Sequence, residues 1–359
     1  MILKRLFARF LPSFRARDAI LAEMYAYYDA QKKHFDELEE KIIDLNEKNE
    51  YLFYSLQHLD GETILDTKKR VLMNMPKASG RIADYQLASN YILSRVKQIC
   101  DQNGLRYALC GGTLLGAVRH HGFIPWDDDV DVDMIREDMC RLEELLQNDD
   151  ELVLKRYYKF RDFGEEAGYL WRVKFRESEV FFVDFFPLDY ISAAPGKEDE
   201  VLQQKEALCT EYSQEIKKIF KKHHFLYNGV DHALPSEELD AEVIPLERKY
   251  LEKYRERFGG DESDSCFTRG IGNGRWLRGI YKIQKSADYL PFERDSVAFE
   301  GEQYCTFKNY DGLLQFQYGD YWSMPSSISL KHEGEHTEFT ETENRLLRIL
   351  REKQKNDEN

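Results

Sequence analysis

Five aspartates crowd into seven residues of this chain, within the run Pro-Trp-Asp-Asp-Asp-Val-Asp-Val-Asp-Met from Pro125 to Met134. Carboxylates this close repel one another unless a cation lies among them, and Mg²⁺ prefers oxygen ligands of this kind. If the run is a strand, its side chains alternate between two faces, so four of the aspartates share a face and can bind metal. An acidic, solvated turn is the alternative interpretation. The four aspartates are Asp127, Asp129, Asp131 and Asp133.

The residues just before this run favour phosphate binding. Gly111-Gly112-Thr113 lies between a short apolar strand and the start of a helix. Glycines allow a ligand to approach the backbone closely, and the N–H groups at a helix N-terminus suit a phosphate. Arg119 follows within the same helix, and a guanidinium can hold a phosphate through two parallel hydrogen bonds. The spacing therefore predicts a diphosphate site next to the aspartates.

A further carboxylate is available from another predicted strand. Asp184 stands alone in the apolar stretch from Phe181 to Pro187, where an unpaired buried charge costs several kcal/mol. It can complete a site for two metal ions that stabilise the entering and leaving oxygens of a phosphoryl transfer. An ion pair between Asp184 and a nearby Arg or Lys is the alternative.

The elements expected around these residues alternate between helix and strand. A strand-turn-helix unit that feeds a mixed sheet indicates an α/β (α+β) catalytic domain. Helices are expected at 82–100, 114–119, 136–147 and 198–228, and strands at 107–110, 152–158, 171–175 and 180–186.

The first part of the chain has a different character. Its first 17 residues carry five cations and no acid, with apolar residues at helical spacing up to Pro12. This pattern is typical of a helix lying in a membrane interface, and a helix that caps the next segment is the alternative. Neither would span a bilayer, because no uncharged apolar run reaches about 18 residues.

A heptad repeat follows from Leu21 to Leu59. Ten of its twelve a and d positions are apolar, and Asn49 is a polar residue at an a position. Such a repeat predicts a coiled coil, and a single Asn at a commonly fixes register and oligomer state. We expect self-association as a dimer. A long helix packed on its own domain is the alternative.

Composition limits the partners and the compartment. The 359 residues carry a net charge of −15, which disfavours binding to nucleic acid, and the six cysteines show no pairing pattern. Scattered cysteines are typical of reduced thiols in the cytoplasm. The expected organisation is a basic amphipathic segment, a coiled coil, a linker, a catalytic domain and a charged helical tail. Their ranges are 1–19, 20–60, 61–80, 81–340 and 341–359.

The stretch from Gly111 to Val132, Gly-Gly-Thr-Leu-Leu-Gly-Ala-Val-Arg-His-His-Gly-Phe-Ile-Pro-Trp-Asp-Asp-Asp-Val-Asp-Val, strongly resembles the LicD family. That family includes bacterial phosphocholine transferases and, more distantly, fukutin and fukutin-related protein. The resemblance covers roughly residues 85 to 335. Further matching blocks are Asp184 to Asp189, Tyr318 to Pro325 with His332 beyond, Arg294, and Phe299 to Gly301.

The resemblance implies a nucleotidyltransferase-like fold, a mixed sheet flanked by helices. Asp129 and Asp131 match the metal pair of the family, Asp184 the third carboxylate, and Asp127 an additional acidic position. Asp133 extends beyond the family pattern and is left unassigned. The substrate-binding residues implied by the match are Gly111, Gly112, Thr113, Arg119 and His332.

The implied reaction moves a phospho-alcohol from a CDP-linked donor to a sugar hydroxyl and releases CMP. Phosphocholine is the first expectation, with Mg²⁺ or Mn²⁺ as the metal and lipopolysaccharide or teichoic acid as the acceptor. The protein is expected in the cytoplasm, at the inner face of the plasma membrane. CDP-ribitol or CDP-glycerol as donor, and a catalytically inactive coiled-coil scaffold, are the alternatives. A choline group calls for an aromatic cage, for which Tyr169, Trp171, Trp276 and Tyr281 are candidates.

Overall fold

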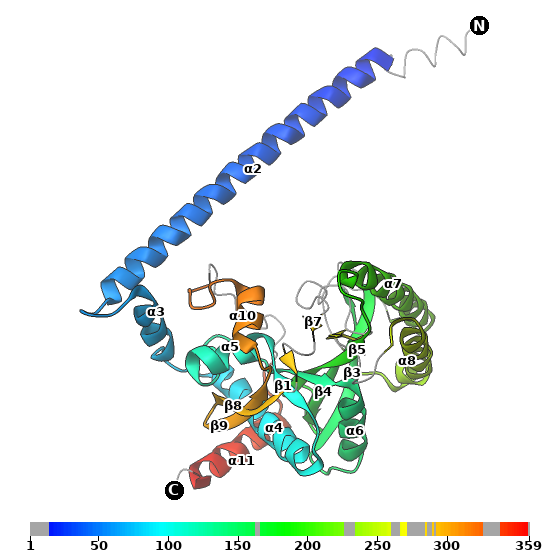
Figure 1. Cartoon of the computed structure of the whole chain (residues 1–359). Helices are drawn as coiled ribbons and strands as arrows, with labels where there is room; N and C mark the ends of the chain where they lie inside the picture. Colours follow the sequence, from blue (N-terminus) through cyan, green and yellow to red (C-terminus); the bar gives the residue numbers. More distant parts are fainter. Residues whose placement is uncertain are drawn as a thin grey trace. The chain divides into compact units, whose positions relative to one another are not determined.

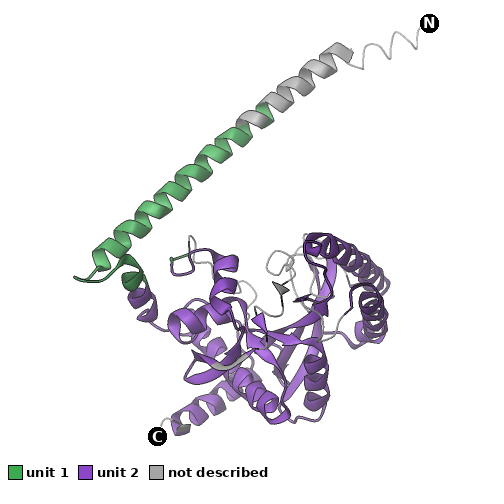
Figure 2. Cartoon of the chain, in the orientation of Figure 1, with its two compact units in different colours: residues 1–68, 323–326 green, residues 69–322, 327–359 purple. Residues whose placement is uncertain are grey.

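The computed structural model describes residues 14–161, 166–225, 234–259, 266–270, 284–285, 289–290, 292–325 and 338–357. The chain divides into two compact units, residues 1–68 with 323–326 and residues 69–322 with 327–359 (Figure 2). The basic segment expected at 1–19 lies largely outside the described residues.

The first unit is dominated by α2 (Phe14–Gln57), one uninterrupted helix over most of the heptad repeat (Figure 1). Within the unit, Lys68 forms an ion pair with Glu50 at 3.0 Å, and its ammonium lies 5.6 Å from the ring centroid of Tyr54. Glu50 and Tyr54 occupy b and f positions of the repeat, opposite the a and d face. That a and d face exposes a row of apolar side chains, Tyr28, Phe35, Leu38, Ile42, Leu45, Leu52 and Leu56.

The second unit is built on a mixed sheet, as the sequence predicts. Five strands follow the order β1-β2-β5-β4-β3, with β6 on the second half of β5 and β7 on β6. Strand β2 is parallel to β5, and the remaining pairs are antiparallel. The strands are β1 (Tyr107–Leu109), β2 (Asp131–Ile135), β3 (Leu152–Arg161), β4 (Glu166–Phe175), β5 (Phe182–Ile191), β6 (Cys266–Arg269) and β7 (Gln284–Lys285). A separate hairpin joins β8 (Glu293–Phe299) to β9 (Glu302–Thr306).

Helices flank this sheet (Figure 1). Apolar side chains of α4, α6, α7 and α8 join the strands in one core, which is rich in aromatic residues. One contact between layers is the hydrogen bond between the hydroxyls of Tyr169 in β4 and Tyr212 in α7, at 3.1 Å. The helices are α3 (Ile64–Met73), α4 (Arg81–Asn103), α5 (Gly111–His120), α6 (Arg136–Gln147), α7 (Glu198–Lys222), α8 (Glu237–Phe258), α10 (Tyr310–Tyr318) and α11 (Glu341–Asp357).

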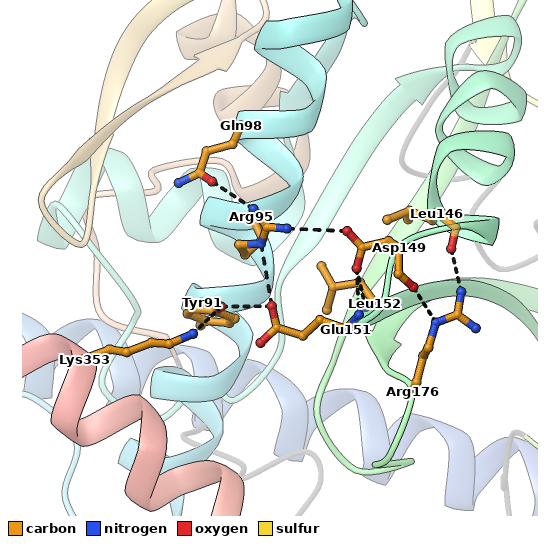
Figure 3. A network of polar contacts seen from close by, with 9 residues as sticks. All are labelled: Tyr91, Arg95, Gln98, Leu146, Asp149, Glu151, Leu152, Arg176 and Lys353. Carbon is orange, nitrogen blue, oxygen red and sulfur yellow. Dashed lines mark hydrogen bonds and ion pairs between the residues drawn. The ribbon is translucent and has the colours of Figure 1, made fainter.

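The C-terminal helix α11 is attached to the sheet unit by its apolar side and by a polar network. Leu346, Leu347 and Leu350 are buried, as their spacing on one side of a helix predicts. Lys353 donates a hydrogen bond to the Tyr91 hydroxyl, which donates to Glu151 at 2.9 Å (Figure 3). The network therefore connects α11 through α4 to the start of β3.

Among the described residues, no helix is long and apolar enough to cross a membrane. All six cysteines are described, and none forms a disulfide. This agrees with the reduced thiols expected from their scattered positions.

Candidate functional site

Two of the predicted metal-binding aspartates lie directly opposite each other on neighbouring strands. Asp131 begins β2, and in the parallel register with β5 its partner is Asp184. The pairing is anchored by the Asp184 amide, which donates to the Val130 carbonyl at 2.8 Å. Directly paired residues lie on the same face, and adjacent strands are about 4.8 Å apart. The fold thus brings together two carboxylates separated by more than fifty residues of sequence.

The aspartate run is a strand only from Asp131 onward, so the expectation of one alternating strand through all five aspartates is wrong. The Asp127 amide donates to the Ile124 carbonyl at 2.9 Å, which makes a turn after Pro125. Gln86 of α4 fixes that turn by donating to the Asp127 carbonyl at 2.7 Å. Because these backbone groups are committed to the turn, residues 127–130 form a loop that leads into β2.

Glycines give this loop and β2 room beside α5. A methyl group on Gly111 would lie 2.7 Å from Oδ2 of Asp131, and one on Gly112 would lie 2.7 Å from Oδ2 of Asp127. Gly111 also has a φ of 55°, in the left-handed region. Residues 111–113 are the first turn of the helix rather than a separate turn before it. The Asp131 amide donates to Oγ1 of Thr113 at 2.8 Å. The glycine-begun helix therefore packs directly against two carboxylates.

The carboxylates of this site are crowded and only partly neutralised. Burial raises the pKa of Asp131 well above its usual range, the charges of Asp129 and Asp184 raise it further, and Arg269 opposes the shift. Burial also raises the pKa of Asp184, against the charge and hydrogen bond of Arg172. Both shifts have the direction expected where negative charge exceeds positive charge in a desolvated site. A bound cation would relieve this repulsion.

Arg172 is a site residue that the sequence reasoning did not name. It lies opposite Asp184 across the β4–β5 pair, and its Nε donates to Oδ1 of Asp184 at 2.8 Å. Its guanidinium lies 3.7 Å from the ring centroid of Phe182, which limits its freedom. The lone aspartate was a signal for a basic partner, and the ion pair considered as an alternative role is present. The same carboxylate retains Oδ2 for a ligand.

Asp133 has a different partner and a different role. Its carboxylate is fully buried, and both Nε and Nη2 of Arg269 lie 3.0 Å from its Oδ1. Arg269 comes from β6 and also lies 4.1 Å from the ring centroid of Phe186. The unassigned aspartate thus forms a buried ion pair between β2 and β6, which makes it structural.

The structure does not place Arg119 beside the glycines. Arg119 is buried in the last turn of α5, eight residues after Gly111, which corresponds to about 12 Å along a helix axis. Its role in binding the donor stays a prediction. His332 lies outside the described residues. Trp126 is partly buried and packs against the core, which fits packing better than stacking on a base.

Two of the residues suggested for a choline cage are buried elsewhere, so that expectation was wrong for them. Tyr169 and Trp171 are almost inaccessible to solvent. The Arg156 guanidinium lies 3.7 Å from the ring centroid of Trp171 and forms an ion pair with Glu247 at 2.9 Å. The two rings therefore serve a buried polar network. Trp276 and Tyr281 lie outside the described residues.

Two segments that come later in the sequence form part of the surroundings of the site. Glu300, in the turn between β8 and β9, accepts a hydrogen bond from the Phe123 amide at 3.2 Å and an ion pair from Lys77 at 2.7 Å. Tyr318, at the end of α10, has its pKa raised by burial and then by the charges of Asp131 and its neighbours. Glu300 therefore contacts the segment just before the aspartate loop, and Tyr318 lies near enough to feel the charges of its aspartates.

The carboxylates fit a metal bound jointly with substrate. Across the described part of the chain, no three His, Cys, Asp or Glu side chains converge closely enough to enclose an ion. Mg²⁺ usually binds through one or two carboxylates together with water and substrate phosphates. Asp131 and Asp184 can supply those two ligands. These two carboxylates thus fit a Mg²⁺ ion whose remaining ligands come from water and substrate.

A mixed sheet with paired aspartates beside a glycine-begun helix is the arrangement expected of a nucleotidyltransferase-like domain. Comparison with known families agrees, because residues 104–227 match the model described as LicD/FKTN/FKRP, nucleotidyltransferase domain. This part of the chain, about a third of its length, is therefore similar to the LicD family, which is the resemblance that the motif predicts.

Individual relatives share different amounts of the chain. Lipopolysaccharide cholinephosphotransferase LicD of Haemophilus influenzae is 24% identical over 254 residues, covering 68% of this chain and 92% of that protein. Human ribitol 5-phosphate transferase FKRP is 35% identical over 98 residues, or 25% of this chain and 18% of that protein. An uncharacterized protein of Rickettsia prowazekii, RP689, is 38% identical over 73 residues, covering 20% of this chain and 27% of that protein. The two relatives with named activities are transferases, which relates this chain to phosphotransferases.

Proposed function

We propose that this protein is a metal-dependent transferase that moves a phospho-alcohol from a CDP-linked donor to a sugar hydroxyl of a cell-surface glycan, releasing CMP. The observation that carries the proposal is the direct pairing of Asp131 with Asp184 beside the first turn of α5. Phosphoryl transfer depends mainly on positioning and on neutralising charge, and the paired aspartates would position the cation that supplies the neutralising charge.

The donor diphosphate would lie over the first turn of α5 and the adjacent aspartates, in contact with both. Backbone N–H groups of Gly111, Gly112 and Thr113 have no partners within the helix and can donate to phosphate oxygens. Asp131 and Asp184, with Asp129 and Asp127 close by, would hold Mg²⁺ or Mn²⁺. A bound divalent ion there supplies charge neutralisation for the transferring phosphate and lowers the pKa of a bound hydroxyl.

Asp184 would bind the divalent cation and, through it, lower the pKa of the acceptor hydroxyl. Arg172 holds Oδ1 and thereby fixes the orientation of the carboxylate, which leaves Oδ2 for the cation. The hydroxyl of the acceptor would approach Asp184 from the side away from Asp131.

Phosphocholine is the first choice of transferred group, because the likeness to the Haemophilus cholinephosphotransferase extends over 92% of that protein. Ribitol phosphate is the second choice, because the match to the human ribitol 5-phosphate transferase is shorter but higher in identity. CDP-glycerol remains an alternative donor of the same chemistry.

The helix α2 would serve self-association and location. Its exposed a and d stripe suits a parallel dimer, in which Asn49 of one copy meets Asn49 of the other. In a parallel pair, the g positions face e positions without any contact between like charges: Tyr27 with Lys32, His34 with Glu39, Lys41 with Asn46 and Lys48 with Phe53. In an antiparallel pair, His34, Lys41 and Lys48 would face g positions of the same kind. The basic segment at 1–19 would contact the inner face of the plasma membrane.

The proposal is tested by a donor screen. The full-length protein is incubated with Mg²⁺, a cell-envelope glycan extract and CDP-choline, CDP-ribitol or CDP-glycerol, and CMP is measured. We expect glycan-dependent CMP release from one donor, and its loss with EDTA or in Asp131→Asn. Absence of release from all three donors, with unchanged dimerisation, would instead support the inactive scaffold.

A further inference from the structure

The paired aspartates belong to a longer row of charged residues across the sheet. Asp131 lies opposite Asp184, Asp184 lies opposite Arg172, and Arg172 lies opposite Lys155. The row crosses β2, β5, β4 and β3, and directly paired residues share a face of the sheet. Two acids are thus followed immediately by two cations, over about 14 Å at the usual strand spacing.

The two cations have hydrogen-bonding capacity left. The guanidinium of Arg172 makes one hydrogen bond among the described residues, from Nε to Asp184, which leaves both terminal nitrogens. Lys155 is partly exposed and makes no ion pair within the described ranges. Lys159, four residues after Lys155 and therefore on the same face of β3, adds positive potential, since its charge lowers the pKa of Asp184.

Besides Asp184, Glu179 is an acid that contacts β3, and it is paired with a cation. Glu179 accepts hydrogen bonds from the Tyr157 hydroxyl and from Lys174, whose ammonium lies 2.6 Å from Oε1. Its charge is therefore matched by Lys174. Lys155 and Lys159 therefore add two positive charges beside the Arg172–Asp184 pair, in a protein whose net charge is −15. A local positive patch of this kind attracts anions.

We propose that Arg172 and Lys155 form a binding subsite for a phosphate group of the acceptor. The inference rests on the proposed function, in which the donor diphosphate lies at the α5 side of Asp131. The cations lie on the opposite side of Asp184, where the acceptor hydroxyl approaches. Arg172 presents a planar fork that matches a phosphate, and Lys155 adds a second charge from the next strand. The acceptor is thereby a phosphorylated glycan, either a sugar phosphate or a phosphodiester.

The test measures binding without turnover. Full-length protein with Mg²⁺ and saturating CMP is titrated calorimetrically with glucose 6-phosphate, with inorganic phosphate, and with glucose as the uncharged reference. The variants are Lys155→Gln and Arg172→Gln, and the matched control is Lys218→Gln, an exposed lysine of α7. We expect glucose 6-phosphate and phosphate to bind wild-type protein and Lys218→Gln alike. Each site variant should weaken both by about tenfold, the size of one lost charge-assisted contact.

The outcomes separate the sources of the phosphate. CMP and CDP-choline affinities within twofold of wild type in Lys155→Gln support the acceptor assignment. An equal loss of donor affinity overturns it, because the phosphate then belongs to the donor. The proposal is also overturned if the wild-type protein does not bind phosphate, or if neither variant changes the affinity for phosphate. Lys155→Gln is decisive if Arg172→Gln fails to fold by circular dichroism. Because no CDP-alcohol turnover is needed, failure of the donor screen leaves this test intact.

Discussion

Asp133 and Arg269 form a fully buried ion pair, with Nε and Nη2 of the arginine 3.0 Å from one carboxylate oxygen. This pair lies only two residues from Asp131 and on the same face of β2. Asp133 is thereby distinguished from Asp131, which is paired with Asp184 and is the proposed metal ligand. The role of each aspartate of β2 depends on which residue of a neighbouring strand it contacts.

Removing the carboxylate charge of Asp133 should destabilise the protein. Asp133→Asn leaves Arg269 buried without its counter-charge, and breaking a buried pair in this way typically costs about 3–5 kcal/mol. We expect a loss of roughly 3 kcal/mol in the free energy of unfolding, measured by urea denaturation. Asp150→Asn, an exposed acid of the α6–β3 turn, is the control and should change stability by less than about 0.5 kcal/mol. Equal stabilities for the two variants would contradict the structural role.

The two glycines that begin α5 should differ in their tolerance of a methyl group. Gly111→Ala combines a left-handed φ of 55° with a contact of 2.7 Å to Asp131, whereas Gly112→Ala has only the contact with Asp127. A non-glycine residue in the left-handed region costs about 1–2 kcal/mol. We expect Gly111→Ala to lose donor-dependent CMP release at least tenfold more than Gly112→Ala, measured at matched folded protein. The reverse order would mean that Asp127 matters more than Asp131.

Much of this arrangement was predictable from sequence, and the missing parts have physical causes. Helix α6 begins and ends at the residues predicted for it, 136 and 147, because its apolar spacing and its polar flanks mark the same range. The carboxylates Asp131 and Asp184 carried strong signals, an acidic run and a lone charge in an apolar strand. Arg172 and Arg269 carried none, because their roles depend on which strands pair.

The loop character of residues 127–130 was also hidden from sequence patterns. Alternating Asp and Val fits a strand, and only the turn hydrogen bonds around Ile124 and Gln86 show that the backbone is used otherwise. Strand β6 and helix α8 were not predicted. Their positions are fixed by long-range pairing, such as that of Arg269 with Leu188. Contacts between residues far apart in sequence are the part that local patterns do not encode.

Neutralising Asp131 should stabilise the metal-free protein while abolishing activity. In the folded state, burial and like charges raise the pKa of Asp131 above its unfolded value. An acid whose pKa is higher in the folded state binds more protons there than in the unfolded state. The free energy of unfolding therefore falls as the pH rises through the folded-state pKa. Asp131→Asn should therefore raise the melting temperature in EDTA at pH 7.5, with a smaller gain at pH 5. Thermal melts at both pH values measure this, and Asp150→Asn again serves as the control.

The same experiment with Mg²⁺ distinguishes a metal site from mere charge repulsion. Added Mg²⁺ and CMP should raise the melting temperature of wild-type protein, because ligands that bind the folded state stabilise it. Asp131→Asn should show no such gain. A Mg²⁺ response that survives in Asp131→Asn would remove Asp131 from the metal site and leave its pKa shift as a packing effect.

The apolar stripe of α2 should hold two copies of the chain together. Ile42 and Leu45 are neighbouring a and d residues with about 57% of each side chain exposed. Ile42→Glu with Leu45→Glu places four like charges at the centre of a dimer seam, which a coiled coil does not tolerate. We expect the double variant to be monomeric by light scattering, with CMP release per chain retained. Glu40→Gln with Glu47→Gln, at f positions facing away from the seam, should remain dimeric.

Asn49 provides the finer test of the parallel arrangement. In a parallel, in-register dimer the two Asn49 side chains meet at an a layer, where a polar pair lowers stability and limits oligomer order. Asn49→Leu should raise the melting temperature of the helix and shift part of the population to higher oligomers. Asn49→Cys should form an intermolecular disulfide under mild oxidation, because a layers bring the two copies of one residue together. Absence of that crosslink, in protein that remains dimeric, would establish an antiparallel or shifted pairing and remove Asn49 as the residue that sets the register.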